Sequence, residues 1–237
     1  MRLSIVSEKG DRAENEDCAG EVKARGIECI VVADGLGGHK SGAVASRIGV
    51  ETVLNKFKEE PRFSGEAIEK YIEYAHEAIF EKSRERLIYS NMGATIAILL
   101  IKGKTAIYGN VGDTRIYHFT DNIIDTVSED HSLAYKQFTD GQIEYEDIRT
   151  SPDQNKLLGA VGLEYNEVYI SEEIPIDGNT AFLVCTDGWW ELINEEQMEN
   201  TLKESNDTKE WINAMREIVV DFPHENKDNF TAAAIFA

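Results

Sequence analysis

Five aspartates in this sequence each lie next to a short apolar stretch of the kind that forms a β-strand. Asp34 ends the run IECIVVAD and Asp187 ends AFLVCTD, and glycine follows each of them directly. The other three occur in comparable settings, Asp17 in NEDC, Asp113 in YGNVGDTR and Asp228 in KDNFTAA. One Asp-Gly pair is most simply a turn, but turn formation is a weaker explanation for five strand ends together.

If these carboxylates converge, their charges must be neutralised. Two unit charges about 4 Å apart repel by roughly 4 kcal/mol at an effective dielectric constant of 20, so the cluster must be protonated or must hold cations. Oxygen ligands favour Mg²⁺ or Mn²⁺ over zinc, and the five histidines show no zinc spacing such as His-Glu-x-x-His. Two such cations about 3.5 to 4 Å apart can activate a bridging water for attack on phosphorus.

The stretch VVADGLGGHKSG, residues 31–42, places four glycines within eight residues of Asp34. Glycine has no side chain, so we expect these positions to let backbone carbonyls and a hydrated ion approach closely. A nucleotide-binding loop is the alternative, but no glycine precedes the Lys-Ser pair as the Gly-Lys-Ser motif requires. The glycines therefore indicate a metal site rather than a direct phosphate cradle.

The elements that must position these aspartates indicate an α+β fold with sheets packed between helical layers. Strands are predicted from short β-branched runs that end in glycine or aspartate, and helices from apolar spacing of three to four residues. The predicted strands cover residues 27–34, 93–101, 104–111, 114–120, 166–174, 180–187 and 230–237. The predicted helices cover residues 43–57, 65–87, 195–203 and 208–220. The three strands between 93 and 120 are typical of an antiparallel meander, and the polar residues 129–165 predict a mobile flap with a little helix.

The chain has 237 residues and a net charge of −20, from 44 acidic and 24 basic side chains. A field of that sign repels nucleic acids and anionic membranes, so neither is expected as a partner. Three widely separated cysteines fit a reducing compartment. The N-terminal residues lack the apolar core of a signal peptide, and the longest apolar run is about half of a membrane span. We expect a cytoplasmic, monomeric protein with one domain over residues 1–237.

Several fragments, in order along nearly the whole chain, resemble the metal-dependent serine/threonine protein phosphatases of the PP2C (PPM) type, in their compact bacterial form. They are RAENED, ADGLGGHKSG, GATIAILLI, GNVGDTRIY, EDHS, LVCTDGWWE and DNFTAA. The resemblance implies a four-layer α-β-β-α sandwich of two antiparallel β-sheets flanked by helices, with metals in a cleft at one end. It also implies hydrolysis of phosphoserine and phosphothreonine by a hydroxide that bridges two Mn²⁺ or Mg²⁺ ions.

The resemblance assigns the metal ligands residue by residue. Asp34 would bridge both ions, and the carbonyl of Gly35 would complete one coordination shell. Asp187 and Asp228 would ligate the first ion.

The remaining roles also come from the resemblance. Asp17, with Glu16 beside it, would hold the water shell of the second ion. Asp113, together with Asp187, matches the residues that hold a third, weaker ion in bacterial members. Arg12 matches the arginine that binds the substrate phosphate, for which a planar guanidinium is suited.

Two histidines and two tryptophans complete the set of candidates. A histidine beside the site can protonate the leaving alkoxide, and His39 is the stronger candidate, with His131 behind it. Trp189 and Trp190 stand where smaller aliphatic residues are common in the resembled family, so they are expected to alter packing or to form a contact surface beside the cleft.

Other phosphatase classes leave marks that this sequence lacks. None of the three cysteines begins a Cys-x5-Arg motif, and the sequence contains neither Asp-x-Asp-x-Thr nor Asn-His-Glu. Two alternatives stay open: a non-catalytic domain that kept the fold and binds a partner, and a two-metal enzyme for small phosphates or phosphodiesters. The expected partners are phosphoprotein substrates and, by analogy, a cognate serine/threonine kinase.

Overall fold

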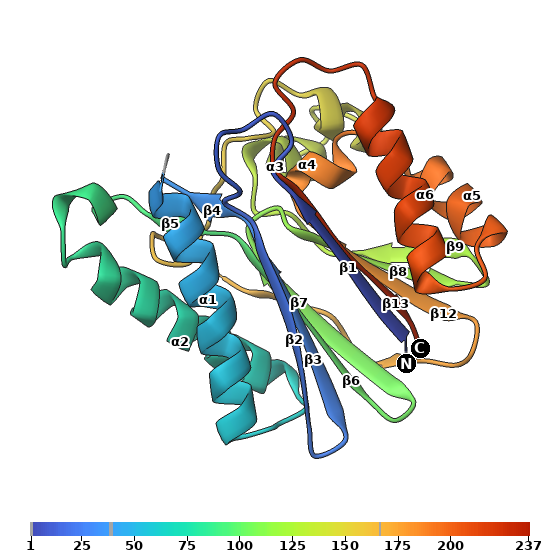
Figure 1. Ribbon diagram of the computed structural model, residues 1–237, viewed down its shortest axis with the longest axis horizontal. Coiled ribbons are helices and arrows are strands. Elements are labelled where there is room, and N and C mark those ends of the chain that lie inside the picture. The colour runs from blue at the N-terminus through green and yellow to red at the C-terminus, as the bar shows by residue number, and fades with distance from the viewer. Residues whose placement is uncertain (1, 38–39, 166) are drawn as a thin grey trace.

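Two antiparallel β-sheets, each of which combines strands from distant parts of the chain, lie face to face at the centre of the structure (Figure 1). The structure is a computed structural model that describes residues 2–37, 40–165 and 167–237. One sheet has the order β1 (Arg2–Glu8), β13 (Phe230–Phe236), β12 (Thr180–Cys185), β8 (Arg115–Thr120) and β9 (Ile123–Val127). The other has the order β10 (Tyr169–Ile170), β7 (Thr105–Val111), β6 (Ile96–Lys102), β3 (Ile27–Ala33) and β2 (Cys18–Ala24), and β11 (Ile174–Pro175) also pairs with β7.

Alternation along the strands divides the apolar side chains among three layers of core. In β3, Ile30 and Val32 pack between the two sheets, where they meet Phe182 and Val184 of β12. The neighbouring side chain, Val31, points to the opposite face, because successive residues of a strand alternate between its faces. Both faces of the central strands are therefore apolar, which explains their unbroken hydrophobic runs.

Helices cover the outer face of each sheet (Figure 1). α1 (Lys40–Glu59) and α2 (Gly65–Ser83) pack on the sheet that contains β3, and the side chain of Ser64 accepts a hydrogen bond from the Ala67 N–H to cap α2. On the other sheet lie α4 (Asp187–Trp190), α5 (Glu195–Glu204) and α6 (Thr208–Asp221). The four-layer α-β-β-α architecture predicted for the chain is confirmed.

Shorter elements connect these layers. β4 (Gly35–Leu36) pairs with β5 (Gly93–Ala94), and η1 (Leu87–Tyr89) joins α2 to β5. The segment 129–165 contains α3 (Leu133–Thr139) and the 3-10 helix η2 (Tyr145–Thr150). None of the helices in the described part of the chain is long and apolar enough to cross a membrane.

The predicted meander over residues 93–120 is wrong in its last step. β6 and β7 form a hairpin, but β8 pairs with β9 and β12 in the other sheet. The chain passes between the sheets at Gly112, whose φ of +98° lies in the left-handed region that favours glycine. Turn residues alone do not reveal this crossing, because glycine and aspartate follow a strand both in a hairpin turn and where the chain changes sheets.

Other boundaries also differ from the predictions. β1 and β2 were not predicted, because their half-buried residues mix charged and apolar side chains. The helix predicted for 65–87 ends at Ser83. The strand predicted for 166–174 is two short strands, β10 and β11, over its described residues.

Candidate active site

A cleft of about 1130 Å³ lies where several strands end together. Asp34 follows β3, Asp113 lies between β7 and β8, Asp187 follows β12 and Asp228 precedes β13. The structure thus brings all five aspartates to one end of the sheets, because Asp17 precedes β2 and its side chain contacts that of Asp34. The predicted residues that line the cleft are Arg12, Glu16, Asp34, Gly35, Asp113, Asp187 and Asp228.

Asp34 is held by its backbone, and its side chain also contacts that of Asp17. Its N–H donates to the Thr95 hydroxyl at 3.0 Å, and its carbonyl accepts from the Thr95 N–H at 2.9 Å. The hydroxyl of Thr95 also contacts that of Thr114 at 2.5 Å. The hydroxyl of Thr114 therefore takes part in this support. The Asp34 carboxylate is therefore left to face the cleft.

Asp17 does not line the cleft itself. The Thr186 hydroxyl donates to Asp17 Oδ2 at 2.9 Å, whereas Oδ1 is buried without a hydrogen-bond partner among the described residues. Burial raises the pKa of Asp17 to about 6, hydrogen bonds with Thr231, Asp34 and Thr186 oppose the rise, and the charge of Asp228 adds to it. A buried carboxylate oxygen without a partner is costly, and a cation or its bound water would satisfy it.

The carboxylates at the cleft repel one another. Burial, followed by the charges of Asp187 and Asp17, raises the pKa of Asp34 well above its ordinary value. Burial, followed by the charge of Asp113, does the same for the pKa of Asp187. Burial also raises the pKa of Asp113 to about 7, with further contributions from Asp130 and Glu191. Ionising these groups together costs free energy that bound cations would remove.

The oxygen ligands at the cleft fit hard cations that keep several of their own waters. No group of three or more histidine, cysteine, aspartate or glutamate side chains within residues 2–37, 40–165 and 167–237 is arranged to hold a metal ion by itself. A structural zinc site, closed by four protein ligands, is therefore absent from this part of the chain. Mg²⁺ is bound through one or two carboxylates while it keeps several waters, and the open cleft with spaced carboxylates suits that case.

Arg12 reaches the cleft from the loop that follows β1. Its Nη2 donates to Asp228 Oδ2 at 2.6 Å, and both side chains are partly exposed. Asn229, which is buried, holds this loop: its Oδ1 accepts from the Glu16 N–H at 2.7 Å, and its Nδ2 donates to the carbonyls of Lys9 and Glu14. Asn229 therefore positions both Arg12 and Glu16.

The glycine-rich stretch allows close approach between parts of the chain itself. A Cβ on Gly35 would lie 2.6 Å from the Glu16 carbonyl and would also collide with the Gly42 carbonyl. A Cβ on Gly42 would lie 2.7 Å from Glu16 Oε2. Glycine at these two positions therefore lets Gly35, Gly42 and Glu16 pack closely together. This reason differs from the predicted one, which was the approach of an ion.

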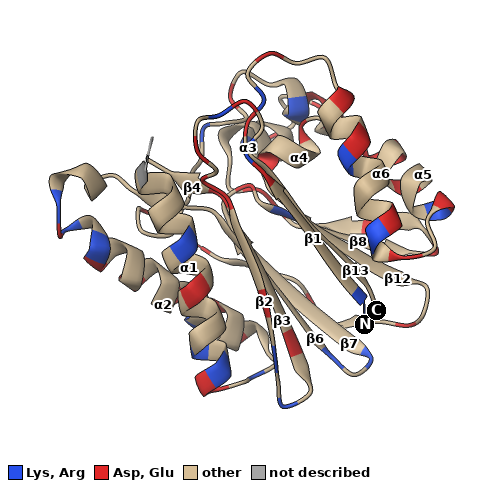
Figure 2. Cartoon of the chain, viewed as in Figure 1, with Lys and Arg blue, Asp and Glu red and all other residues tan. Residues whose placement is uncertain are grey.

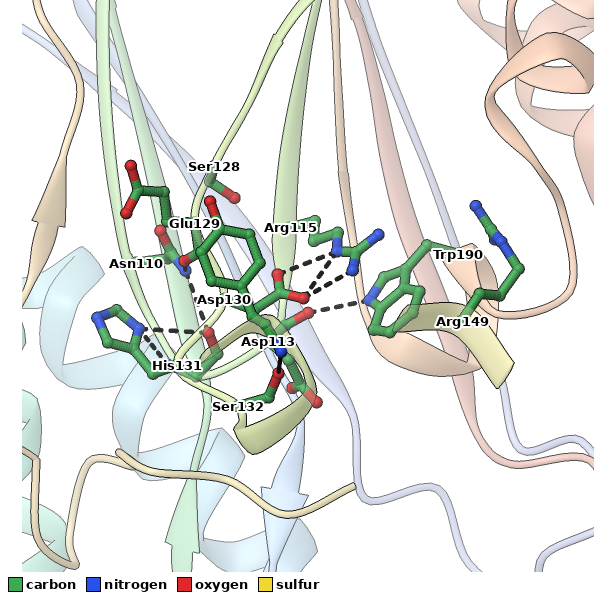
Figure 3. Close-up of polar contacts among 12 residues, drawn as sticks. Asn110, Asp113, Arg115, Ser128, Glu129, Asp130, His131, Ser132, Arg149 and Trp190 are labelled. Atoms are coloured by element: carbon green, nitrogen blue, oxygen red, sulfur yellow. Dashed lines mark hydrogen bonds and ion pairs between the residues drawn. The ribbon is translucent and has the colours of Figure 1, made fainter. Parts of the chain in front are cut away.

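The two histidine candidates have different outcomes. His39 lies outside the described residues. His131 lies beside the crossing between the sheets, where its Nδ1 accepts from the Gly112 N–H at 3.1 Å and its own N–H donates to the Gly112 carbonyl at 2.9 Å (Figure 3). These contacts hold the turn that carries Asp113, so His131 has a structural explanation.

Glu191 belongs to this acidic group, although no role was predicted for it from the sequence. Burial raises the pKa of Glu191 to about 7, the charge of Asp228 adds to the rise, and the charges of Arg115 and Arg149 oppose it. Its Oε1 is buried without a hydrogen-bond partner among the described residues. Glu191 ends the fragment LVCTDGWWE, one helical turn after Asp187. This spacing is the sequence feature from which its place in the site could have been predicted.

A sequence profile of the protein phosphatase 2C family matches residues 7–219. The serine/threonine phosphatase Stp of Listeria monocytogenes is 31% identical over 213 residues, which cover 86% of this chain and 83% of that protein. The protein phosphatase PhpP of Streptococcus pneumoniae is 27% identical over 215 residues, 86% of this chain and 82% of that protein.

Solved structures share the fold. The serine/threonine phosphatase of S. agalactiae superposes with a TM-score of 0.89 at 22% identity, covering 100% of this chain and 99% of its own. Stp1 of Staphylococcus aureus gives 0.88 at 23% identity, covering 99% and 94%. The catalytic domain of the phosphatase PstP, solved in complex with two manganese ions, gives 0.81 at 22% identity, covering 98% and 96%.

Proposed function

Because the chain belongs to the protein phosphatase 2C family, we propose that it is a metal-dependent phosphatase that hydrolyses phosphoserine and phosphothreonine in proteins. The single observation that supports this most is the convergence of strand-end aspartates and Arg12 on one cleft. The raised pKa values of these carboxylates support cation binding.

We infer that two Mn²⁺ or Mg²⁺ ions, with a third bound more weakly, are the cofactors. When bound, such ions neutralise phosphoryl charge and lower the pKa of their bound water. The residues that would hold them are Glu16, Asp17, Asp34, the Gly35 carbonyl, Asp113, Asp187 and Asp228. The manganese ions of PstP support this choice of metal.

Among the described residues, Arg12 would act on the substrate directly. It would bind two phosphoryl oxygens with its planar guanidinium and so orient the phosphate. Protonation of the leaving alkoxide is assigned to His39 as a prediction from the sequence.

The partners we propose are phosphoproteins and the kinase that modifies them. We further propose that the protein is cytoplasmic and monomeric. Its single domain would cover residues 1–237, with residues 129–165 as a flap. Figure 2 shows acidic residues gathered in the loops around β4 and α4. The net charge of −20 supports the exclusion of nucleic acid and anionic membranes as partners.

The test is hydrolysis of a phosphothreonine peptide by metal-stripped protein that is titrated with Mn²⁺. Activity should appear with metal and should be lost in Asp187→Ala. The matched control is Asp125→Ala, which removes an exposed carboxylate on β9 and should leave activity intact. A wild type that binds Mn²⁺ but stays inactive on this peptide would favour a non-catalytic binding domain or a different phosphate substrate.

A further inference from the structure

Trp190 links the two turns that carry Asp113 and Asp187. Asp187 is the first residue of α4 and Trp190 is the last. The indole Nε1 of Trp190 donates to the backbone carbonyl of Asp113 at 2.9 Å, as Figure 3 shows. Asp113 and Asp187 belong to different parts of the chain, and this hydrogen bond connects α4, which begins at Asp187, to the turn that carries Asp113.

The indole ring is itself fixed from one face by Arg115. The guanidinium carbon of Arg115 lies 3.6 Å from the ring centroid of Trp190. The same guanidinium makes a two-point contact with Asp130, with Nη2 to Oδ2 at 2.7 Å and Nε to Oδ1 at 3.0 Å, and both side chains are almost fully buried (Figure 3). A planar group held at two points cannot rotate freely, so the stacked ring has one favoured orientation.

The adjacent tryptophan provides an internal comparison. Trp189 is equally buried, and its ring packs against Phe230 with centroids 6.0 Å apart. Its Nε1 has no hydrogen-bond partner among the described residues. Trp189 is therefore a core residue, whereas Trp190 makes a directed contact to the turn of Asp113.

We propose that Trp190 is a positioning residue that fixes Asp113 relative to Asp187 and thereby sets the affinity of a cation that needs both carboxylates. This inference rests on the proposed function, because it concerns the same site. Outer contacts that orient metal ligands commonly change metal affinity by about tenfold or more when they are removed.

The test compares Trp190→Phe with Trp189→Phe by isothermal titration calorimetry of metal-stripped protein with Mn²⁺. Both variants lose the same atoms from a buried site, but only Trp190→Phe loses the hydrogen bond to Asp113. We expect the weakest Mn²⁺ binding step to weaken by about tenfold in Trp190→Phe and to be unchanged in Trp189→Phe. Thermal unfolding without metal measures the shared loss of packing.

Arg115→Lys is a second variant that removes the ring's support rather than the ring. Lysine presents no planar group to the indole and cannot make the two-point contact with Asp130, so it should weaken the same binding step. Equal Mn²⁺ affinity in wild type and Trp190→Phe, or equal losses in the two tryptophan variants, would overturn the proposal. A wild type that binds no Mn²⁺ would instead overturn the metal dependence in the proposed function, and this proposal with it.

Discussion

Arg12 and Asp228, 216 residues apart in the sequence, form an ion pair at the cleft with Nη2 and Oδ2 2.6 Å apart. The side chains are 55% and 41% exposed, so the pair is screened by water and contributes little to stability. The residue assigned to phosphate is therefore joined to one assigned to metal. Because the contact is weak, the proposed phosphate would be able to replace Asp228 as the partner of Arg12, and the proposed cation would be able to replace Arg12 as the partner of Asp228.

Arg12→Ala should chiefly raise the KM for a phosphopeptide, because it removes the two-point grip on the phosphate. Arg12→Lys should recover part of the loss, since it keeps the charge but not the fork. Steady-state kinetics at saturating Mn²⁺ measures both. A variant with normal KM and a reduced kcat would contradict the binding role.

Asp113→Asn should change the pH dependence of stability in the metal-free protein. The folded-state pKa of Asp113, about 7, lies above its ordinary value of 3.8, so the folded protein binds the extra proton between these values. The stability that Asp113 contributes is thus complete below pH 3.8 and is lost as pH rises towards 7. Asparagine carries no charge. As pH rises through this window, the free energy of unfolding of the variant should therefore increase relative to that of wild type by roughly 1 kcal/mol per pH unit.

Urea unfolding of both proteins from pH 5 to pH 8 tests this, with no added metal. The gain should disappear when Mn²⁺ is present, because a cation neutralises the carboxylate. A stability difference that does not vary with pH would show that Asp113 ionises as an ordinary aspartate.

Asn229→Ala should destabilise the fold and reduce catalysis together. The substitution leaves the Glu16 N–H and two carbonyls of the loop without their buried partner, at a cost of about 1 to 3 kcal/mol. The loop also carries Arg12, so kcat/KM for a phosphopeptide should fall. Thermal unfolding and kinetics are measured on the same sample, and loss of neither would refute the positioning role of Asn229.

Gly35→Ala should be destabilising even without metal. Its Cβ meets backbone carbonyls of Glu16 and Gly42, which cannot move away as a flexible side chain does. Overpacking of this kind costs about 1 to 3 kcal/mol. Gly178→Ala is the control, because a Cβ there meets nothing within 4 Å. Equal thermal midpoints for the two variants would contradict the close-approach explanation.

Ile88→Ser should weaken binding of phosphopeptides that carry an aliphatic residue beside the phosphothreonine. Ile88 lines the cleft and is 67% exposed, so it offers apolar surface next to the reacting group. Covering a side chain of that size contributes about 1.5 kcal/mol or more, which corresponds to a KM change of roughly tenfold. Ile123→Ser, at the start of β9, is the exposed control. If peptides with serine and leucine at that position are cleaved equally well by wild type, Ile88 does not select substrates.

The sequence alone determined which residues could form the site and the class of fold. Asp34 and Asp187 were predictable because an apolar strand followed by Asp-Gly is a local pattern, and burial of both strand faces follows from continuous apolar runs. The roles of these residues as ligands stay predictions. The sequence could not place β1 and β2, whose composition lacks a clear period.

Only the tertiary structure decided which distant residues meet. The crossing of β8 into the other sheet, the pairing of Arg12 with Asp228 and the hydrogen bond from Trp190 to Asp113 each join residues that no local pattern connects. The raised pKa values of Asp113 and Glu191 likewise depend on burial and on neighbouring charges. Local sequence sets conformational preference, whereas packing sets desolvation and distance, and these govern the chemistry of the carboxylates.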